Sequence, residues 1–408
     1  MKLKEKRRKA ARRSRKRKTA TTEPADTIVA AATAPGAAGV AIVRISGGKA
    51  EAIARRMLGS LPEPRTATYR AFRNITGEKL DTGLALYFPA PASFTGEPVI
   101  ELHGHGGPIV VSLLIDAAIA LGARLAEPGE FSKRAFLNDK LDLVQAEAIA
   151  DLIGGGTEQA VRAALRSLSG EFSARVNALI ERVTRLRMHV EAAIDFPEEE
   201  IDFLDDDDLH AGLADCGEAF ETLLAEASIG RTLRDGFQVV LVGKPNVGKS
   251  SLMNRLSGED TSIVTEVAGT TRDVLRETID IDGLAVELVD TAGLREDPDR
   301  VEEEGIRRAR EAMSRADAVL WIQDASDDGD DKIDDPVPDG IPITIVRNKI
   351  DLTGEAPGVE HNDRAVVMLS AKTGQGIDEM RNHIRELAAY RNLGEGAFTA
   401  RRRHVDAL

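Results

Sequence analysis

The spacing of apolar residues changes twice along the chain, and each region predicts a different kind of structure. Between residues 25 and 140, short apolar runs typical of strands accompany two helical stretches. Such a mixture predicts an α+β domain. The strand candidates in this region are the segments GVAIVRIS, LALYFP and PVIELHG.

Residues 141–235 follow helical spacing. Apolar residues recur every three or four positions from Val161 to Val190, as on one face of a single long amphipathic helix. Pro197 and the acidic segment FPEEEIDFLDDDDL then interrupt the pattern. We interpret this segment as a solvated connection rather than a metal site, because no spaced glycine turn accompanies its carboxylates. The region as a whole predicts an all-α domain.

Residues 236–388 alternate near-continuous apolar strands with helices. Strands of this kind are buried on both faces, which predicts an α/β domain with a mostly parallel sheet. Residues 389–408 resemble the beginning of a further helix. The strand candidates are FQVVLVG, AVELVD, DAVLWIQD, IPITIVRN and AVVMLS.

Composition narrows the class of protein. With 42% hydrophobic residues among 408, the chain has the content of a soluble globular protein. The longest apolar run, PIVVSLLIDAAIALG, is interrupted by Asp116 and is too short to span a membrane. Cys216 is the only cysteine, which excludes a disulfide framework and a cysteine-based metal cluster and fits the reducing cytoplasm.

The net charge of −14 conceals a basic arm at the N-terminus. Residues 1–18 hold twelve Lys or Arg and one Glu. We expect residues 1–24 to be disordered, with a nucleic-acid-binding arm as the alternative. The arm lacks the apolar core of a secretory signal. A transit peptide stays open as an alternative, although the arm is nearly serine-free and too densely charged to be amphipathic.

The segment GKPNVGKS matches the phosphate-binding loop G-x-x-x-x-G-K-[ST] and lies between a predicted strand and a predicted helix. Its glycines let backbone N–H groups approach phosphates, and the following helix adds the positive end of its dipole. Lys249 is expected to reach the β- and γ-phosphates, and the Ser250 hydroxyl to coordinate Mg²⁺. The nucleotide-binding residues expected here are Gly243, Asn246, Val247, Gly248, Lys249, Ser250 and Ser251.

Four further motifs follow in order, at strand ends or in the loops between strands. Thr271 in GTTRD offers a second Mg²⁺ hydroxyl, and Asp290 in DTAG offers a carboxylate to the magnesium shell. Asp351 in NKID can accept from guanine N1–H and N2–H₂, a donor pair that adenine lacks, and Ala371 in LSAK can present its N–H to guanine O6. The set predicts a GTP-binding domain and adds Thr270, Thr271, Asp290, Thr291, Ala292, Gly293, Asn348, Lys349, Asp351, Ser370, Ala371 and Lys372.

Leu294, which follows DTAG, leaves the hydrolysis step open. Many small GTPases place a glutamine there to orient the attacking water, and an apolar side chain cannot do so. An apolar residue at this place also occurs in the Era and Der ribosome-assembly GTPases. The G domain alone therefore does not decide the biological role.

Segments outside the G domain resemble the MnmE (TrmE) family of tRNA-modification GTPases. They are DTIVAAATAPGAAGVAIVRISG, FTGEPVIELHGHGGP, PGEFSKRAFLNDKLDLVQAEAIADLI and EAAIDFPEEEIDF. The resemblance implies an N-terminal folate-binding and dimerisation domain over residues 25–140 and a helical domain beginning with residues 141–235. It also implies a G domain inserted at 236–388, with residues 389–408 as the start of the helical domain's C-terminal part.

The resemblance implies a homodimer that works on tRNA with the FAD-dependent partner MnmG, as a heterotetramer. Together they add a carboxymethylaminomethyl or aminomethyl group at C5 of the wobble uridine. The carbon comes from 5,10-methylene- or 5-formyltetrahydrofolate. By motif, the folate-binding candidates are Arg44, Glu101 and Lys140. Glu101 can accept from a pterin's N–H edge, and the two cations can pair with carboxylates; without the resemblance, all three read as surface charges.

The resemblance also implies how hydrolysis proceeds with Leu294. K⁺ supplies positive charge beside the γ-phosphate when two G domains pair, and Glu302 in VEEE orients the water. Taken alone, Asn246 would cap its loop and Glu302 would begin a helix. The implied K⁺ ligands are Asn246, Thr265, Val267 and Thr270, of which Thr265 also contacts the nucleotide; the implied catalytic residues are Glu302, Lys249 and Thr271.

Two alternative functions stay open at this point. A ribosome-assembly GTPase is one, although Der would need a second Walker motif and Era a KH domain after the G domain. The other is a folate-sensing regulatory GTPase without modification chemistry. It arises because the chain ends at Leu408, before the C-x-G-K motif of the family, and we expect a C-terminally truncated member for which Cys216 is no substitute.

Overall fold

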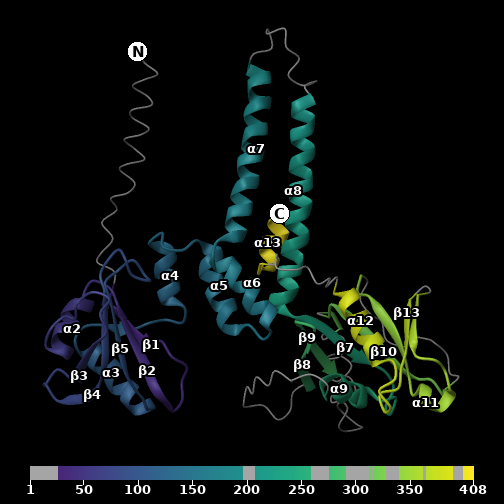
Figure 1. The fold of residues 1–408 in the computed structure, drawn as a ribbon, viewed down its shortest axis with the longest axis horizontal. Coiled ribbons are helices and arrows are strands. Elements are labelled where there is room, and N and C mark those ends of the chain that lie inside the picture. The colour runs from purple at the N-terminus through teal and green to yellow at the C-terminus, as the bar shows by residue number, and fades with distance from the viewer. Residues whose placement is uncertain are drawn as a thin grey trace, which may run out of the picture. The chain divides into compact units, whose positions relative to one another are not determined.

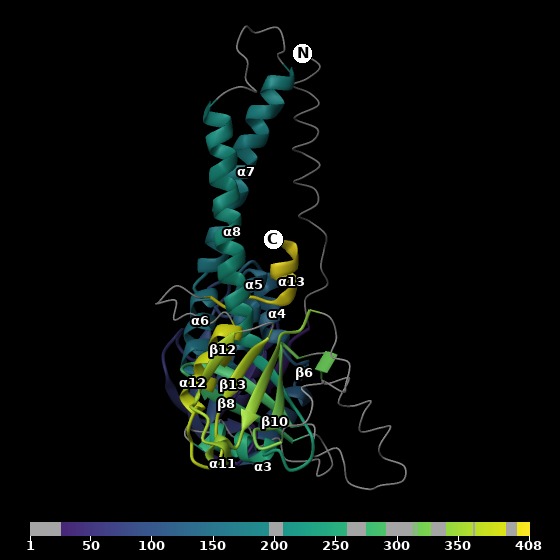
Figure 2. The same ribbon diagram turned by 90° about the vertical axis from the view of Figure 1, so that its right-hand side faces the viewer.

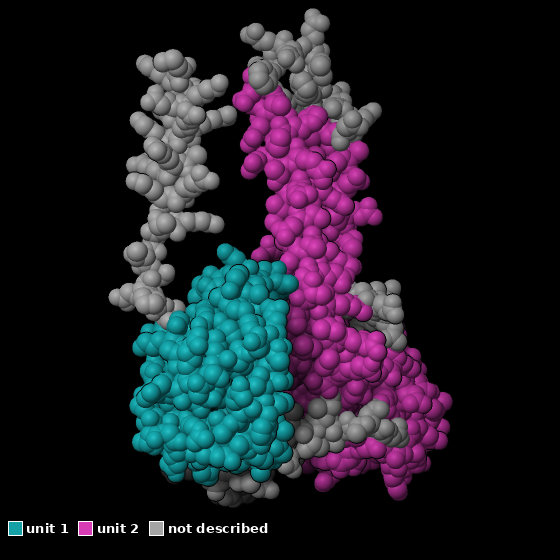
Figure 3. Space-filling view, turned by 60° about the vertical axis from the view of Figure 1, so that its left-hand side comes forward, with its two compact units in different colours: residues 1–146 teal, residues 147–408 magenta. Residues whose placement is uncertain are grey.

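The computed structural model describes residues 26–195, 207–258, 275–290, 313–314, 316–327, 340–361, 364–388 and 398–408. The chain forms two compact units, residues 1–146 and 147–408 (Figure 3). The expected arm of residues 1–24 and residues 196–206 of the acidic connection lie outside the described residues. Among the described residues, no helix is long and apolar enough to cross a membrane.

In the described part of the first unit, six strands form one sheet in the order β3-β4-β5-β2-β1-β6 (Figure 1). Alternate residues of β2 and β5 face a core that α2 and α3 cover, which leaves Arg44 and Glu101 on the opposite face. The sequence predicted two helical stretches here, and the structure adds a third, α4. The elements are β1 (Ile28–Ala31), β2 (Ala38–Ser46), α2 (Ala50–Leu58), β3 (Thr68–Arg73), β4 (Lys79–Phe88), β5 (Val99–Gly106), α3 (Pro108–Ala120), β6 (Arg124–Leu125) and α4 (Glu130–Leu137).

The second unit begins with helices α5 (Leu143–Gly154), α6 (Glu158–Leu168), α7 (Glu171–Asp195) and α8 (Asp207–Asp235). The long α7 and α8 pack along each other (Figures 1 and 2). The prediction of one continuous helix from Val161 to Val190 is wrong, because Gly170 adopts a φ of 87° between α6 and α7. The apolar spacing continues across this break because both helices pack against α8.

The C-terminal residues return to these helices. Phe398 is fully buried, and the Thr399 hydroxyl lies 3.0 Å from the Ser167 hydroxyl at the end of α6. Helix α13 (Arg402–Ala407) packs on α8. The C-terminal segment follows the α/β region in sequence. It nevertheless packs against α6 and α8, which precede that region.

The described residues of the α/β region form a sheet in the order β12-β13-β11-β10-β7-β9-β8. Strands β9, β7, β10, β11 and β13 are parallel, and β8 and β12 pair antiparallel at the two edges. Every segment predicted as a strand forms one. The elements are β7 (Phe237–Val242), α9 (Lys249–Gly258), β8 (Leu275–Ile281), β9 (Leu284–Asp290), β10 (Ala318–Asp324), β11 (Ile343–Asn348), α11 (Ile350–Thr353), β12 (Gly358–His361), β13 (Ala365–Met368) and α12 (Ile377–Leu387).

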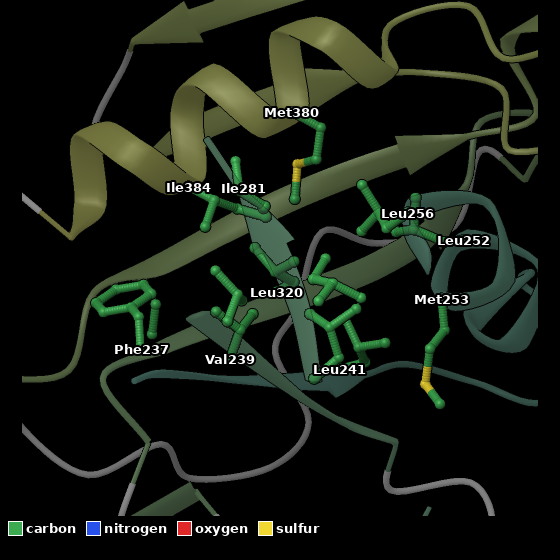
Figure 4. Packing of buried hydrophobic residues seen from close by; sticks show 14 of the residues in the cluster. Phe237, Val239, Leu241, Leu252, Met253, Leu256, Ile281, Leu320, Met380 and Ile384 are labelled. Carbon is green, nitrogen blue, oxygen red and sulfur yellow. The ribbon is translucent and has the colours of Figure 1, made fainter. Parts of the chain in front are cut away.

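The core of this sheet explains its continuous apolar strands. Leu241 and Leu320 lie between the sheet and the side chains that α9 and α12 supply, among them Leu252 and Met380 (Figure 4). A second cluster that includes Val240 covers the other face. Because both faces are buried, successive residues of the central strands are apolar.

Candidate functional site

The phosphate-binding loop joins the end of β7 to the start of α9, at the edge where the parallel strands end. Two positions of this loop require glycine, because a side chain would clash there and because the backbone φ is positive. A Cβ on Gly243 would lie 2.3 Å from the Ile322 carbonyl oxygen, at a φ of 154°. A Cβ on Gly248 would lie 2.3 Å from Nδ2 of Asn348, at a φ of 100°. The loop can hold this shape only with glycine at both places.

We expect Gly248→Ala to lower nucleotide affinity by about tenfold or more, because a positive φ costs an alanine about 1–2 kcal/mol and the new methyl group would displace Asn348. The Asn348 amide cannot easily move, since its residue is 2% exposed and it donates to the Val247 carbonyl. Titration with a fluorescent guanine nucleotide measures the effect. Gly258→Ala, on the same helix with open space around its Cβ position, is the matched control. Equal affinities for the two variants would contradict the steric argument.

Lys249, Ser250 and Asp290 gather at the phosphate end of the site. The Lys249 ammonium, on a buried residue, donates to the carbonyls of Gly243 and Lys244 at 2.7 and 2.8 Å. The Ser250 hydroxyl lies 3.2 Å from Oδ2 of Asp290, and Asp290 itself is 1% exposed. A hydroxyl and a carboxylate side by side are hard oxygen donors, which fit Mg²⁺.

The end of β11 fastens the phosphate-binding loop from the other side. Asn348 donates from Nδ2 to the Val247 carbonyl at 2.8 Å and accepts at Oδ1 from the Ala371 N–H at 3.0 Å. Lys349, with a φ of 69°, donates from its ammonium to the Asn246 carbonyl at 2.9 Å. The NKID motif thus links the phosphate loop to the SAK loop through side chains.

Asp324, at the end of β10, belongs to this cluster and was missed by the sequence reasoning. Its Oδ2 accepts from the Lys349 ammonium at 2.6 Å. The hydrogen bond from Lys349, with a second from Ser326, lowers the pKa of Asp324 to about 2. Asp324 therefore stays charged and holds Lys349 over the loop. The sequence signal that could have identified Asp324 is its position as an acidic residue at the carboxyl end of a central parallel strand.

The base end of the site contains Asp351 and the SAK loop. Asp351 is exposed on the short helix α11, and its Oδ1 accepts from the Ser370 hydroxyl at 2.6 Å. That bond orients one carboxylate oxygen and leaves acceptor capacity for a base. Ala371 is buried, and Lys372 beside it is exposed. The contact predicted between the Ala371 N–H and guanine O6 stays a prediction.

Asn246 is the described member of the implied K⁺ site. It is exposed at the tip of the phosphate-binding loop, with a φ of 66°. The remaining predicted residues of the switch regions lie outside the described residues. They are Thr265, Val267, Thr270, Thr271, Thr291, Ala292, Gly293, Leu294 and Glu302.

In the first unit, Arg44 and Glu101 meet across neighbouring strands. They are paired in the β2–β5 register, and Nε of Arg44 lies 2.8 Å from Oε1 of Glu101. The guanidinium carbon also lies 5.3 Å from the ring centre of Phe94 and 5.6 Å from that of Phe131. His103 shares Glu101 at 3.2 Å. The two aromatic rings and His103 are neighbours that the sequence motifs did not identify.

Lys140 joins the same neighbourhood through the loop of residues 93–97. A Cβ on Gly96 would lie 3.3 Å from Cγ of Lys140. The aliphatic part of the Lys140 side chain therefore lies beside this loop, at a residue two positions after Phe94. The rest of Lys140 is exposed. The structure thus brings Arg44 and Glu101 into contact and leaves Lys140 at the border of the same loop.

A buried ion-pair network anchors α4 beside these residues. Glu130 accepts from Arg124 at 2.7 Å and from Arg134 at 2.9 Å, and Arg134 also contacts Glu97. The pKa of Glu130 is lowered to about 2, and the hydrogen bond from Arg124 is the largest cause. A carboxylate with this depressed pKa stabilises the fold at neutral pH, and the contribution is lost as the pH falls toward 2. The PGEF segment therefore positions the helix that carries Phe131.

Two histidines of β5, His103 and His105, contact carboxylates. His105 contacts Asp81 through Nδ1 at 2.7 Å, and its backbone N–H donates to the same carboxylate. His103 contacts Glu101. All three residues of the HGH segment belong to β5, so the segment is part of the strand and not a turn beside it.

Comparison with known proteins covers nearly the whole chain. Residues 27–140 match the model described as the GTP-binding protein TrmE N-terminus, and residues 143–408 match the MnmE helical domain. The tRNA modification GTPase MnmE of Marinobacter nauticus is 53% identical over 395 residues, which cover 94% of this chain and 86% of that protein.

The similar solved structures include two FeoB proteins. The cytosolic domain of the T. maritima FeoB iron transporter in a GDP form is 24% identical over 40% of this chain and 66% of its own, with a TM-score of 0.28. The FeoB G domain from Methanococcus jannaschii is 22% identical over 38% of this chain and 98% of its own, with a TM-score of 0.26. From the two family models and the Marinobacter relative, the chain belongs to the MnmE family of tRNA modification GTPases.

Proposed function

We propose that this chain hydrolyses GTP in the service of tRNA modification. The observation that carries the proposal is the cluster in which Lys249, Ser250 and Asp290 meet a loop that Asn348 and Lys349 fasten. The relative from Marinobacter nauticus is named a tRNA modification GTPase, which supports the biological role. GTP and Mg²⁺ are the nucleotide and cation that the donor set fits.

The residues of the phosphate end bind and orient the γ-phosphoryl group. The backbone N–H groups of the phosphate-binding loop, except at Pro245, and those at the start of α9 offer donors to the phosphates. Lys249 exchanges the carbonyls of its own loop for phosphate oxygens. Ser250 and Asp290 would position Mg²⁺, and the bound ion would neutralise negative charge in phosphoryl transfer.

The second part of the proposal concerns the hydrolysis step, for which many small GTPases use a glutamine where this chain has Leu294. K⁺ supplies positive charge beside the γ-phosphate, and Asn246 binds it together with Thr265, Val267 and Thr270. The exposed position of Asn246 at the loop tip supports this role, since a second G domain can approach it. Glu302 orients the water as a hydrogen-bond acceptor.

The third part places a tetrahydrofolate derivative at Arg44, Glu101 and Lys140. The Arg44 guanidinium, between two aromatic rings and a carboxylate, is in a setting where a planar heterocycle can stack and hydrogen-bond. We expect Arg44→Ala to weaken binding of 5-formyltetrahydrofolate by about tenfold or more, measured by calorimetry. Arg55→Ala, at an exposed arginine of α2, is the control. Unchanged affinity in Arg44→Ala would remove this site from the proposal.

The partners follow from the family. The chain acts as a homodimer with a flavoprotein of the MnmG type on the wobble uridine of tRNA. Mass spectrometry of tRNA nucleosides from a modification-deficient bacterium that expresses this chain tests the role. Restoration of the C5-substituted uridine supports the proposal. Its absence, with normal GTP hydrolysis by the same protein, favours a regulatory GTPase.

A further inference from the structure

A cluster of nitrogen and oxygen ligands lies at the edge of the α/β sheet that β12 forms. His361 ends β12, and His383 and Glu386 lie on α12, which packs against β12 (Figure 2). One ligand atom from each residue lies within 4.8 Å of the others. The two residues of α12 are separated by three positions, so their side chains lie on the same face of the helix.

His383, the buried member of this cluster, has an unsatisfied ring nitrogen. The residue is 4% exposed, and its Nε2 lies 2.7 Å from the hydroxyl of buried Thr344. Nδ1 is buried and has no hydrogen-bond partner among the described residues. A buried polar atom without a partner is unfavourable, so a group that binds Nδ1 would stabilise the structure.

The contact with Thr344 can orient the His383 ring, as hydrogen bonds to the second ring nitrogen of a metal-binding histidine do. If Nε2–H donates to the Thr344 hydroxyl, Nδ1 carries the lone pair and the ring orientation is fixed. The ring of His361 lies 6.2 Å from that of His383, edge to face.

We propose that His361, His383 and Glu386 bind a divalent first-row transition-metal ion of the Zn²⁺ class. Two imidazoles and a carboxylate form a ligand set typical of zinc with a fourth position open to water. Ligands of one tetrahedral zinc lie about 3.3 Å apart, at metal distances of about 2.0–2.1 Å. His361 and Glu386 are exposed and can rotate to close the gap, whereas buried His383 supplies the fixed point.

The ion would fasten the edge strand to the helix that follows the SAK loop. In the described sheet, β12 pairs with β13 on one side only. The site is separate from the Mg²⁺ position, which lies at the strand ends near Ser250. It is therefore a structural site, with consequences for stability rather than for the chemistry of GTP.

Calorimetric titration of the full chain with Zn²⁺, in excess Mg²⁺ and GDP to fill the nucleotide site, tests the proposal. We expect one equivalent to bind and to raise the unfolding temperature. His361→Ala and Glu386→Gln should each weaken binding by about tenfold or more. Both changes are at exposed positions, so the variants should fold.

His210→Ala is the matched control, because His210 is an exposed histidine on α8 far from the cluster in sequence. It should bind Zn²⁺ as the unmodified chain does. Absence of saturable binding would overturn the proposal. So would equal affinities for the unmodified chain and a variant that carries both His361→Ala and Glu386→Gln, because the bound ion would then lie elsewhere.

Discussion

Replacing Asp351 by asparagine is expected to lower the affinity for GTP by about 10²- to 10⁴-fold, which corresponds to two hydrogen bonds to a charged group at about 1.5–3 kcal/mol each. The carboxylate is exposed on α11, and Ser370 holds one of its oxygens at 2.6 Å. Both guanine donors, N1–H and N2–H₂, need an acceptor. An asparagine amide offers one acceptor and turns a donor toward the other group.

Xanthosine triphosphate makes the test specific. Xanthine carries an oxygen where guanine carries the N2 amine, so the amide of Asp351→Asn can accept from N1–H and donate to that oxygen. We expect the variant to bind xanthosine triphosphate better than GTP, measured by competition with a fluorescent nucleotide. Asp378→Asn, at an exposed carboxylate of α12, should leave both affinities unchanged. An Asp351→Asn variant that still prefers GTP would show that another residue reads the base.

Replacing Glu302 by alanine is expected to lower the turnover number for GTP by about 10²- to 10⁴-fold, the range for a group that positions or deprotonates a reacting water. Nucleotide affinity should change little, because the proposed mechanism gives Glu302 a contact with the attacking water and none with the nucleotide. Leu294 offers no polar atom for this task, so removal of Glu302 would leave the water without an acceptor. Single-turnover hydrolysis and nucleotide titration on the same sample separate the two quantities.

The neighbouring glutamates provide the control for this variant. Glu304→Ala removes the same charge from the same VEEE run, so it shows the effect of losing one negative charge from this run. Its turnover should stay near that of the unmodified chain. If Glu302→Ala turns over as fast as Glu304→Ala, the water is oriented by another group and the assignment of Glu302 is wrong.

The sequence predicts the central strands well because they are buried on both faces. Leu241 and Leu320 belong to runs that only a covered parallel sheet accommodates. The edge strands β8 and β12 carry mixed sequences, LRETIDI and GVEH, and were not predicted. The break at Gly170 was missed as well, since the apolar spacing continues through it and a single glycine is also compatible with a helix interior.

The residues proposed for the nucleotide site could be named from the sequence because its motifs are local in sequence. The links between motifs could not. The bonds from Asn348 to the Val247 carbonyl and from Lys349 to Asp324 depend on which strand ends lie next to each other. The same holds for Arg44 and Glu101, whose contact depends on the β2–β5 register. The metal cluster at His361 joins an edge strand to a helix, and no sequence motif marks it.

The initial rate of phosphate release from GTP by the full chain, in KCl and in NaCl at equal concentration, tests the central claim most directly. The claim is that Asn246-bound potassium supplies the positive charge at the γ-phosphate while Glu302 orients the water. It predicts a rate at least about tenfold higher in K⁺, since an electrostatic group at the transition state contributes this much or more. Equal rates in the two salts would contradict it.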